Sequence, residues 1–254
     1  MPKIITIANQ KGGVGKTTTA SNVSACIGVA EKRTLLIDMD PQSNATSGLG
    51  VDHNEVEKSI YEALLHDEDI NDVIIPTEIA YLDLAPATTR LVGAEIELIN
   101  AIGREKILRD VIHNIEKEYD YIFIDCPPSL GLLTINSLTA SNSVLIPIQC
   151  EYYALEGLSQ LLKTIRLVQK HLNPELEIEG VVLTMYDNRL NLSNQVASDV
   201  RNYFGDKVFK TVVQRNVRLS EAPSFGKPVI LYDAVCMGAE NYMQLAEEII
   251  EHEK

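Results

Sequence analysis

A glycine-rich segment near the amino terminus combines the residue types and the spacing of a phosphate-binding loop. It follows the apolar run Ile4–Ala8, it precedes a helical pattern, and it reads Asn9-Gln10-Lys11-Gly12-Gly13-Val14-Gly15-Lys16-Thr17-Thr18. Glycines let a backbone turn tightly and direct its N–H groups at an anion, and a following helix adds a favourable dipole. We expect Lys16 to reach the β- and γ-phosphates of a nucleotide and the Thr17 hydroxyl to bind Mg²⁺.

The loop departs from the strict phosphate-loop pattern in two ways. The pattern has glycine where Gln10 stands, and the loop carries a second lysine, Lys11. The strand before it and the helix after it argue against a plain glycine turn with a chance lysine. Lys11 is poorly placed to serve its own phosphates, because the loop backbone already surrounds them. Two interpretations stay open: Lys11 reaches the nucleotide of a second subunit, or it is a solvated surface lysine.

Carboxylates follow two other apolar runs. The run Thr34–Ile37 ends in Asp38 and Asp40, and the run Tyr121–Ile124 ends in Asp125. At the carboxyl ends of parallel strands these groups would meet beside the phosphate loop. We expect Asp125 and Asp38 to support Mg²⁺ and Asp40 to orient a water molecule. A single such aspartate would more often cap a turn, but two strand ends beside a phosphate loop favour a site.

Short β-branched runs alternate with helical periodicity along the whole chain, which predicts a parallel sheet covered by helices. The predicted strands are 4–8, 34–37, 121–124, 143–146 and 180–183, and helical spacing marks 20–30, 155–165 and 242–249. The more polar stretch Val51–Gly93 is interpreted as an insertion at one end of the sheet. We expect one α/β domain spanning residues 1–254.

Composition limits the possible partners and compartments. The 254 residues carry a net charge of −14, with 45% hydrophobic residues, so the chain can bury a full core but repels nucleic acid and anionic membranes overall. The four cysteines lack metal-ligand spacing and predict reduced thiols, with Cys126 packed in the core. No leader-like segment or membrane-length apolar run is present, which predicts a soluble cytoplasmic protein.

One window departs from the acidic balance. Residues 180–230 contain seven lysines and arginines against four acids, a local charge of +3 that leaves −17 for the remainder. Solvated helix faces often produce such an asymmetry, so by itself it is weak support for DNA binding.

Three motifs together resemble the deviant-Walker ATPases: Lys11–Thr18, Asp38–Gln42 and Asp125–Ser129. Further stretches, which together extend over nearly the whole chain, resemble the ParA/Soj chromosome-partitioning ATPases within that group. These stretches are Asn44–Gly50, Gly93–Leu98, Gln149–Gly157 and Asn216–Ser224. The resemblance implies a three-layer P-loop NTPase-like α/β fold, a mostly parallel twisted sheet with helices on both faces.

The resemblance also implies roles for individual residues. Lys11 would contact the phosphates of the partner subunit's ATP, and Asp40 would position the hydrolytic water. Asn216 would contact adenine, and so would Gln214, which stands where relatives have proline. Arg189 and Arg218 would hold duplex DNA without sequence preference. The phosphate cradle would consist of Lys11, Gly12, Gly13, Val14, Gly15, Lys16, Thr17 and Thr18, with Mg²⁺ held at Thr17, Asp38 and Asp125.

The function implied is that of an ATPase with ATP/ADP and Mg²⁺ as cofactors. Its ATP-bound homodimer would bind DNA on the nucleoid, and a ParB-type centromere-binding partner would stimulate hydrolysis. Control of replication initiation or transcription is a further implied role. Two alternatives stay open, a small-molecule ligase of the biotin-pathway type and a DNA-independent nucleotide-switched regulator. A membrane anchor is disfavoured because the carboxyl-terminal segment 245–254 holds four glutamates, and an iron–sulfur protein because the cysteine contexts do not fit.

Overall fold

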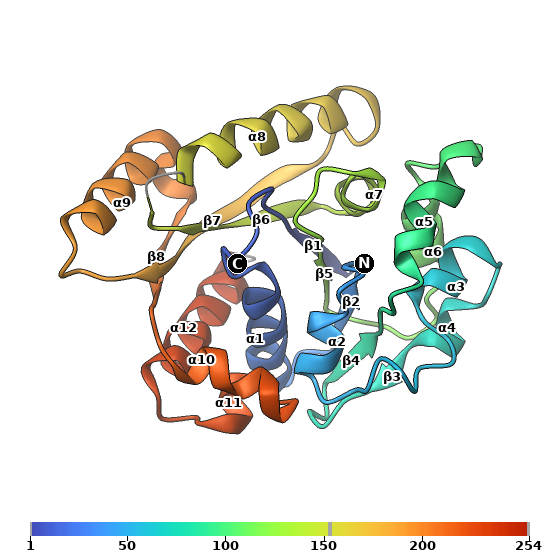
Figure 1. The fold of residues 1–254 in the computed structure, drawn as a ribbon, viewed down its shortest axis with the longest axis horizontal. Coiled ribbons are helices and arrows are strands. Elements are labelled where there is room, and N and C mark those ends of the chain that lie inside the picture. Colours follow the sequence, from blue (N-terminus) through green and yellow to red (C-terminus); the bar gives the residue numbers. More distant parts are fainter. Residues whose placement is uncertain (1, 152–153, 253–254) are drawn as a thin grey trace.

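The computed structural model describes residues 2–151 and 154–252 (Figure 1). In this part of the chain eight strands form one sheet in the order β3-β4-β2-β5-β1-β6-β7-β8, parallel except for the β3–β4 pair. The strands are β1 (Lys3–Ile7), β2 (Thr34–Asp38), β3 (Ile75–Pro76), β4 (Leu82–Ala85), β5 (Tyr121–Asp125), β6 (Ser143–Gln149), β7 (Glu177–Tyr186) and β8 (Val208–Gln214).

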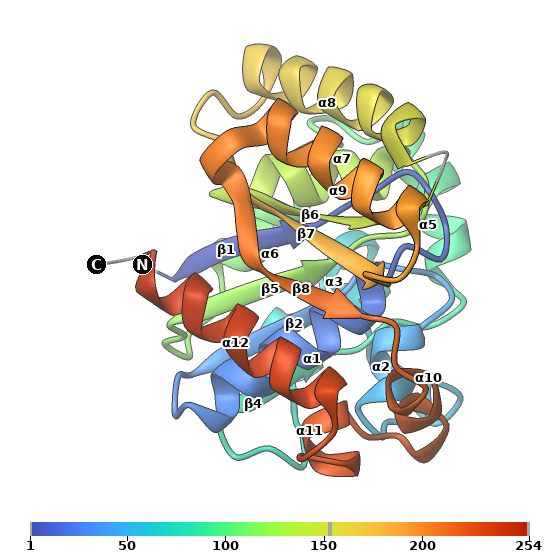
Figure 2. The same ribbon diagram turned by 90° about the vertical axis from the view of Figure 1, so that its left-hand side faces the viewer.

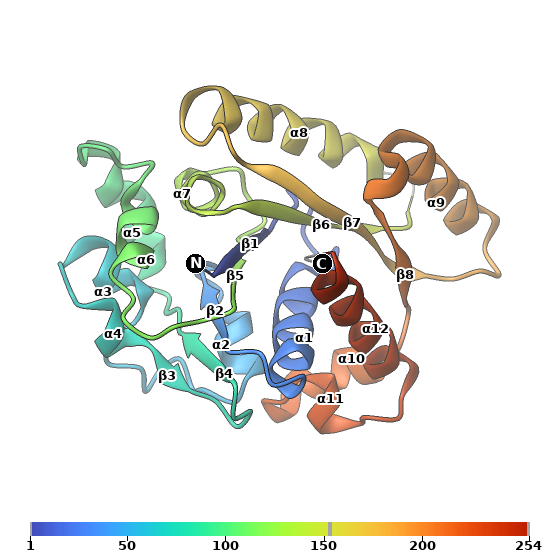
Figure 3. The same cartoon turned by 180° about the vertical axis from the view of Figure 1, so that it is seen from behind.

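Helices cover both faces of the sheet, so the architecture is the three-layer α/β arrangement that the sequence predicts. On one face α1 and α12 lie side by side, which Figures 1 and 3 show from opposite sides, and α3 to α9 cover the other face. The helices are α1 (Lys16–Val29), α2 (Asn44–Gly48), α3 (Ile60–Leu65), α4 (Ile70–Val73), α5 (Leu91–Glu97), η1 (Leu98–Asn100), α6 (Ile107–His113), α7 (Leu132–Ala140), α8 (Ala154–His171), α9 (Asn191–Phe204), η2 (Gly205–Lys207), α10 (Arg218–Glu221), η3 (Ala222–Phe225), α11 (Val229–Tyr232) and α12 (Met237–Glu251).

The alternation of side chains along the central strands divides the core between the two faces. In β2, Leu36 packs into the cluster under α1 and α12, whereas Leu35 and Ile37 pack into the cluster under α3, α5, α6 and α7. All three are fully buried, which is why the strand reads as one continuous apolar run rather than as an alternating one.

All five strands predicted from apolar runs are confirmed. The segment Val51–Gly93 lies at one end of the sheet as expected, but it also contributes to the sheet: β4 pairs in parallel with β2, and β3 adds an antiparallel edge. Strand β8, at the other edge, lies outside the predicted runs because the exposed polar residues Lys210 and Gln214 interrupt its apolar residues. Within the described residues, no helix has the length and apolarity needed to cross a bilayer.

Candidate active site

The glycine-rich loop connects β1 to α1 at the carboxyl edge of the sheet. Figure 2 shows this edge on the right, where the strand arrows end. Gly13 and Gly15 have φ values of 73° and 88°, a left-handed conformation that side chains rarely adopt. Gly15 is the N-cap of α1 and provides no side chain to cap it, so the first backbone N–H groups of this 14-residue helix remain available to an anion.

Hydrogen bonds to two other strands hold the loop in place. Asn9 donates from Nδ2 to the carbonyl of Pro147 at 2.7 Å and accepts the Lys11 N–H at Oδ1 at 3.0 Å. Thr184 of β7 donates its hydroxyl to the carbonyl of Val14 at 2.8 Å. The loop is therefore preorganised by β6 and β7, which lowers the ordering cost of binding a phosphate.

Lys16 points back into its own loop. Its ammonium donates to the carbonyl of Lys11 at 3.1 Å, and its side chain is buried. Burial lowers the pKa of Lys16, and the carboxylates of Asp125 and Asp40 act in the opposite direction. The structure thus brings Lys16 close enough to the predicted carboxylates of Asp125 and Asp40 for their charges to interact.

The strand register places Asp38 and Asp125 directly beside each other at the ends of β2 and β5. Asp38 is saturated with hydrogen bonds: Oδ2 accepts from the N–H and the hydroxyl of Thr46 at 2.9 and 2.8 Å, and Oδ1 accepts from the Asp40 N–H at 3.1 Å. Burial raises the pKa of Asp38 to about 6, and these hydrogen bonds oppose the rise. Asp38 therefore fastens α2 to the sheet, whatever part it takes in a metal shell.

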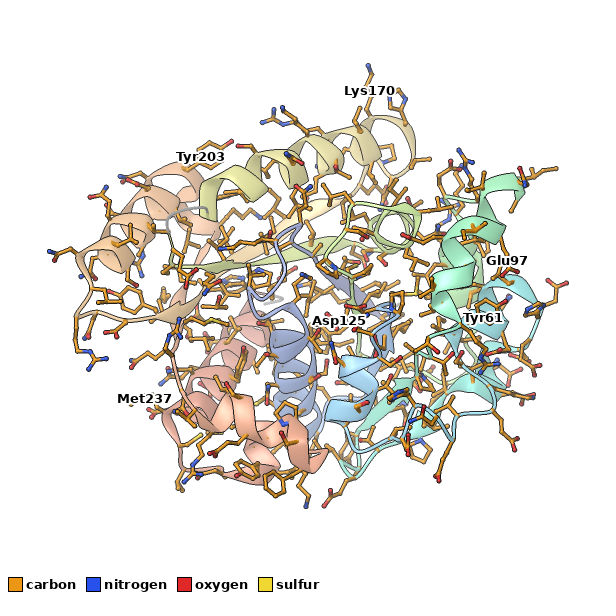
Figure 4. The ribbon with its side chains drawn as sticks, in the orientation of Figure 1. Tyr61, Glu97, Asp125, Lys170, Tyr203 and Met237 are labelled. Atoms are coloured by element: carbon orange, nitrogen blue, oxygen red, sulfur yellow. The ribbon has the colours of Figure 1, made fainter. Side chains whose placement is uncertain are left out.

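Asp125 differs from its neighbour because both of its oxygens are buried and lack a hydrogen-bond partner among the described residues. Burial and the charge of Asp38 raise its pKa well above the ordinary value, while the nearby Thr17 hydroxyl and Lys16 oppose the rise. A buried carboxylate without a partner is costly unless a cation or donor completes it. Figure 4 shows Asp125 near the middle of the molecule.

The Asp125 carboxylate and the Thr17 hydroxyl suit a Mg²⁺ ion that is bound together with a nucleotide. Mg²⁺ prefers oxygen ligands and keeps waters and substrate phosphates in its shell, which suits one orphaned carboxylate beside a threonine hydroxyl. In the part of the chain that the structure describes, no cluster of three or more His, Cys, Asp or Glu side chains could hold a metal by itself. Phosphate oxygens and water molecules would therefore supply the remaining ligands.

Asp40 lies in the segment that leaves β2, and its Oδ1 accepts the Gln42 N–H at 2.9 Å. Its side chain is buried, and its charge contributes to the environment of both Lys16 and Asp125. Cys126 is fully buried, and burial raises the pKa of its thiol to about 12, which confirms a packed thiol rather than a nucleophile. All four cysteines are free, as predicted.

Lys11 lies at the rim of the loop and forms an ion pair that the sequence does not reveal. Its ammonium is 3.6 Å from Oε2 of Glu151, and Oε1 of the same carboxylate is 3.6 Å from the guanidinium of Arg215. Both the lysine and Glu151 are partly exposed, so the ion pair is worth less than about 1 kcal/mol and leaves Lys11 free to move.

The remaining predicted residues follow the ends of β7 and β8. These neighbouring strands are parallel, with Tyr186 opposite Gln214, so Arg189, Arg218, Gln214 and Asn216 lie at the same edge as the phosphate loop. Gln214 is exposed and donates its N–H to Asn241, whereas Oδ1 of Asn216 accepts the Arg218 N–H at 2.8 Å.

Both candidate DNA-binding arginines are engaged by acids in this state. Arg189 donates to both oxygens of Asp187 and lowers the pKa of that carboxyl to about 2. Arg218 contacts Glu221 at 2.7 Å and Asp233 at 3.2 Å. These ion pairs are solvent-exposed and therefore exchangeable for phosphate.

Four residues of the site lie outside the sequence prediction: Asn9, Thr46, Glu151 and Thr184. Asn9 directly follows the strand before the loop, a position that could have indicated a brace. Thr46 and Glu151 lie in stretches that carry the family resemblance, but nothing in those stretches assigns them a contact, and Thr184 reaches the loop from a distant segment without a local signal. A cavity of about 1050 Å³ lies at the opposite edge of the sheet, where its lining includes Lys32, Arg33 and Glu118, and contains none of the predicted residues.

Comparisons with known proteins agree with this geometry. A family described as an AAA domain matches residues 2–178. The chain is 62% identical over 249 residues to the sporulation initiation inhibitor protein Soj of Bacillus subtilis, covering 98% of each chain. It is 58% identical over 251 residues to the chromosome partitioning protein ParA of Myxococcus xanthus, covering 99% of this chain and 89% of that protein.

Solved structures share the fold. Cobyrinic acid a,c-diamide synthase from Mycobacterium smegmatis with bound ADP and magnesium has a TM-score of 0.87 at 35% identity, covering 99% of this chain and 95% of that one. A putative plasmid partition protein from Borrelia burgdorferi bound to AMPPNP has a TM-score of 0.85 at 26% identity, with complete coverage of both chains.

Proposed function

Because the chain belongs to the ParA/Soj family of chromosome-partitioning ATPases, we propose that its ATP-bound form is a homodimer that binds DNA and is reset by hydrolysis. The observation that carries the proposal is the pairing of a two-lysine phosphate loop with the orphaned carboxylate of Asp125. ATP or ADP and Mg²⁺ are its cofactors, supported by the magnesium–ADP and AMPPNP complexes of the structural neighbours.

Different groups of the loop would bind different parts of ATP–Mg²⁺. The N–H groups from Gly13 to Thr18 would surround the β-phosphate, and Lys16 would turn from the Lys11 carbonyl to the phosphates. Thr17 and Asp125 would hold the magnesium shell, with Asp38 supporting it through the end of β2. Mg²⁺ supplies charge neutralisation on the β- and γ-phosphates when it is bound.

Lys11 would complete the site from the partner subunit. A monomer lacks one cation for the charge that develops on the γ-phosphate, and a preorganised donor there is worth about 3 kcal/mol. That gain exceeds the cost of leaving Glu151, which is below about 1 kcal/mol. Hydrolysis removes the phosphate that both subunits contact, so the dimer weakens and the nucleotide state controls assembly.

We expect Asp40→Ala to block turnover while preserving the ATP-bound dimer. The charge of Asp40 acts on Asp125 beside the loop, and Asp40 would orient the attacking water, so its loss should lower the turnover number about a hundredfold or more. Turnover is measured by phosphate release and assembly by analytical ultracentrifugation. Asp110→Ala, which removes an exposed carboxylate of α6, should change neither. An Asp40→Ala variant that stays monomeric with ATP would remove the water-positioning role.

The DNA-binding face is proposed at Arg189 and Arg218. Both lie at the carboxyl edge of neighbouring strands, within the window whose local charge is +3. Dimerisation doubles this face, so two weak contacts act on one duplex. Arg218→Glu should retain ATP-dependent dimers and lose at least about tenfold in DNA affinity, with a salt slope reduced by about one for each arginine lost.

Fluorescence anisotropy with duplex DNA at two salt concentrations measures this effect. Lys32→Glu is the matched control, because it makes the same charge reversal at the opposite edge of the sheet. Salt-sensitive binding that survives in Arg218→Glu would place the DNA face elsewhere.

We propose nucleoid association in the cytoplasm and stimulation of hydrolysis by a ParB-type partner, as the family membership supports. A small-molecule ligase is the alternative supported by the fold shared with the diamide synthase. ATP-dependent retention on DNA supports partitioning, whereas turnover of an acid substrate without DNA binding supports the ligase. Nucleotide-controlled partner binding without DNA retention would support the DNA-independent regulator.

A further inference from the structure

The segment that carries Arg218 packs against α2, the short helix that follows the turn of Asp40. Helices α10 and η3 form one continuous helical run from Arg218 to Phe225, which ends at Gly226. Figures 1 and 2 show α10 and α11 beside α2, and η3 contacts α2 directly. The contact therefore joins the helix that follows β2 to the element that holds a candidate DNA-binding arginine.

Two glycines form the closest part of this contact. Gly50 and Gly226 have φ values of 86° and 64°, in the left-handed region. A Cβ added to Gly226 would lie 2.8 Å from the Cα of Gly50, and a Cβ added to Gly50 would lie 3.0 Å from the carbonyl oxygen of Gly226. The two backbones thus touch without side chains between them. Because close-packed atoms cannot be compressed, a shift of one backbone displaces the other.

The opposite side of α2 is held by the nucleotide site. The hydroxyl of Thr46 donates to Oδ2 of Asp38 at 2.8 Å and accepts the N–H of Ala87, which follows β4, at 2.9 Å. Thr46 is fully buried, and its own N–H also donates to Asp38. Helix α2 is therefore fixed between the ends of two strands and the segment of Arg218. A change at Asp38 reaches Gly50 through one short helix.

A second buried contact connects the same segment to the phosphate loop. Asn22 of α1 donates from Nδ2 to the carbonyl of Thr18 at 2.7 Å and accepts at Oδ1 the N–H of Val229, the first residue of α11, at 2.6 Å. Asn22 is buried, and Thr18 lies in the first turn of α1, which would face the phosphates. The segment is thus anchored at Gly226 on α2 and, three residues later, at Val229 on α1.

We propose that Gly226 and Asn22 are positioning residues that set the orientation of Arg218 according to the nucleotide bound. The inference rests on the proposed DNA binding and names the contacts through which that binding responds to ATP. Arg218 precedes both anchors in the chain and forms an ion pair with Asp233, which follows them. A shift at the anchors therefore changes the separation of these two charges and releases the guanidinium for a DNA phosphate. Packed elements transmit such shifts because they move as units.

The test compares DNA affinity with ATP and with ADP in the Asp40→Ala background, where ATP should stay intact. Fluorescence anisotropy with duplex DNA gives the ratio of the two affinities. Gly226→Ala should lower this ratio about fivefold or more, the lower end of coupling between two sites. Gly205→Ala is the matched control. Its φ of 56° gives the same backbone strain, but the added Cβ would meet nothing described within 4 Å beyond its chain neighbours.

Asn22→Ala tests the second anchor without introducing backbone strain. Its matched control is Asn136→Ala, on the opposite face of the sheet. Asn136 is also buried, donates to the carbonyl four residues earlier, that of Leu132, at 3.0 Å, and accepts the N–H of Leu108 at 3.1 Å. Both substitutions should lower Tm, because each removes a buried pair of hydrogen bonds. Only Asn22→Ala should lower the ratio of DNA affinities.

A double substitution separates this role from general loss of structure. Adding Arg218→Glu should cost less DNA affinity in the Gly226→Ala chain than in the background, because both changes act on the same contact. Dimers formed with ATP, measured by analytical ultracentrifugation, should persist in Gly226→Ala.

Unchanged ratios in both anchor variants, or equal losses in the two controls, would overturn the inference. Loss of the ATP-bound dimer in Gly226→Ala would also overturn it, because the contact would then serve assembly. A background that binds DNA equally with ATP and with ADP would overturn the proposed ATP-dependent DNA binding itself, and this inference with it.

Discussion

Replacing Lys16 with alanine should lower ATP turnover by about two to three orders of magnitude, the cost of removing one preorganised donor from a site that stabilises developing charge. The ammonium is the one buried cation in the electrostatic group formed with Asp125 and Asp40 among the described residues. Without it, phosphate charge would enter beside Asp125 and Asp40 with no buried cation to offset these carboxylates. Phosphate release and the affinity for a fluorescent ATP analogue should both fall.

The same substitution also leaves Asp125 and Asp40 without their nearest cation, so folding must be checked separately. Lys16→Met retains the aliphatic stem and removes only the charge, and it should lose turnover equally while unfolding cooperatively. Lys32→Ala, an exposed lysine at the far edge, should keep turnover within about twofold. Turnover retained in both Lys16 variants would show that the glycine-rich loop is not the nucleotide site.

The loop and its carboxylates are predictable from sequence because each depends on local order. A buried strand followed by glycines, a lysine and a helix fixes the loop, and an aspartate after an apolar run lies at the carboxyl edge once the sheet is parallel. The register of β2 with β5 then brings Asp38 beside Asp125. Even the ion pairs of the arginines have local signals, since Asp187 is two residues before Arg189 and Glu221 three after Arg218.

The contacts that the sequence does not predict depend on packing between distant segments. Glu151 meets Lys11 only because β6 lies next to β1, and no spacing in the sequence reports that contact. The side of α5 that packs in the core is hidden in the sequence for a different reason: the buried Leu91 and Leu98 and the exposed Ile96 and Ile99 are equally apolar. Periodicity therefore predicts a helix but not which side the core takes.

Replacing Asp125 with asparagine should stabilise the ligand-free protein and abolish its response to magnesium. The carboxylate is buried, unpartnered and next to Asp38, so its ionised form costs stability that a neutral isostere recovers. We expect the free energy of unfolding at pH 7 to rise by about 1–3 kcal/mol, which raises Tm by about 2–4 °C for each kcal/mol. Asp110→Asn, an exposed control, should stay within about 0.5 kcal/mol.

The direction of the pH dependence follows from the raised pKa of Asp125. The folded protein holds the proton of the Asp125 carboxyl more tightly than the unfolded chain does. Asp125 therefore does not destabilise the folded protein below the ordinary aspartate pKa of about 4, and its destabilising effect grows as the pH rises above that value. The stability difference between variant and wild type should therefore widen from pH 4 to pH 7.

The response to magnesium distinguishes a role of Asp125 in metal binding from its effect on the stability of the ligand-free protein. At a ligand concentration of about a hundred times Kd, bound Mg²⁺–ADP should stabilise the wild type by about 2.7 kcal/mol. The variant should respond to ADP as wild type does in the presence of chelator, because its phosphate loop is intact, but should gain nothing further from Mg²⁺. Thermal unfolding followed by circular dichroism measures both effects. A ligand-free variant less stable than the wild type, or one that keeps the magnesium response, would show that the Asp125 carboxylate is satisfied within the protein and is no part of the metal shell.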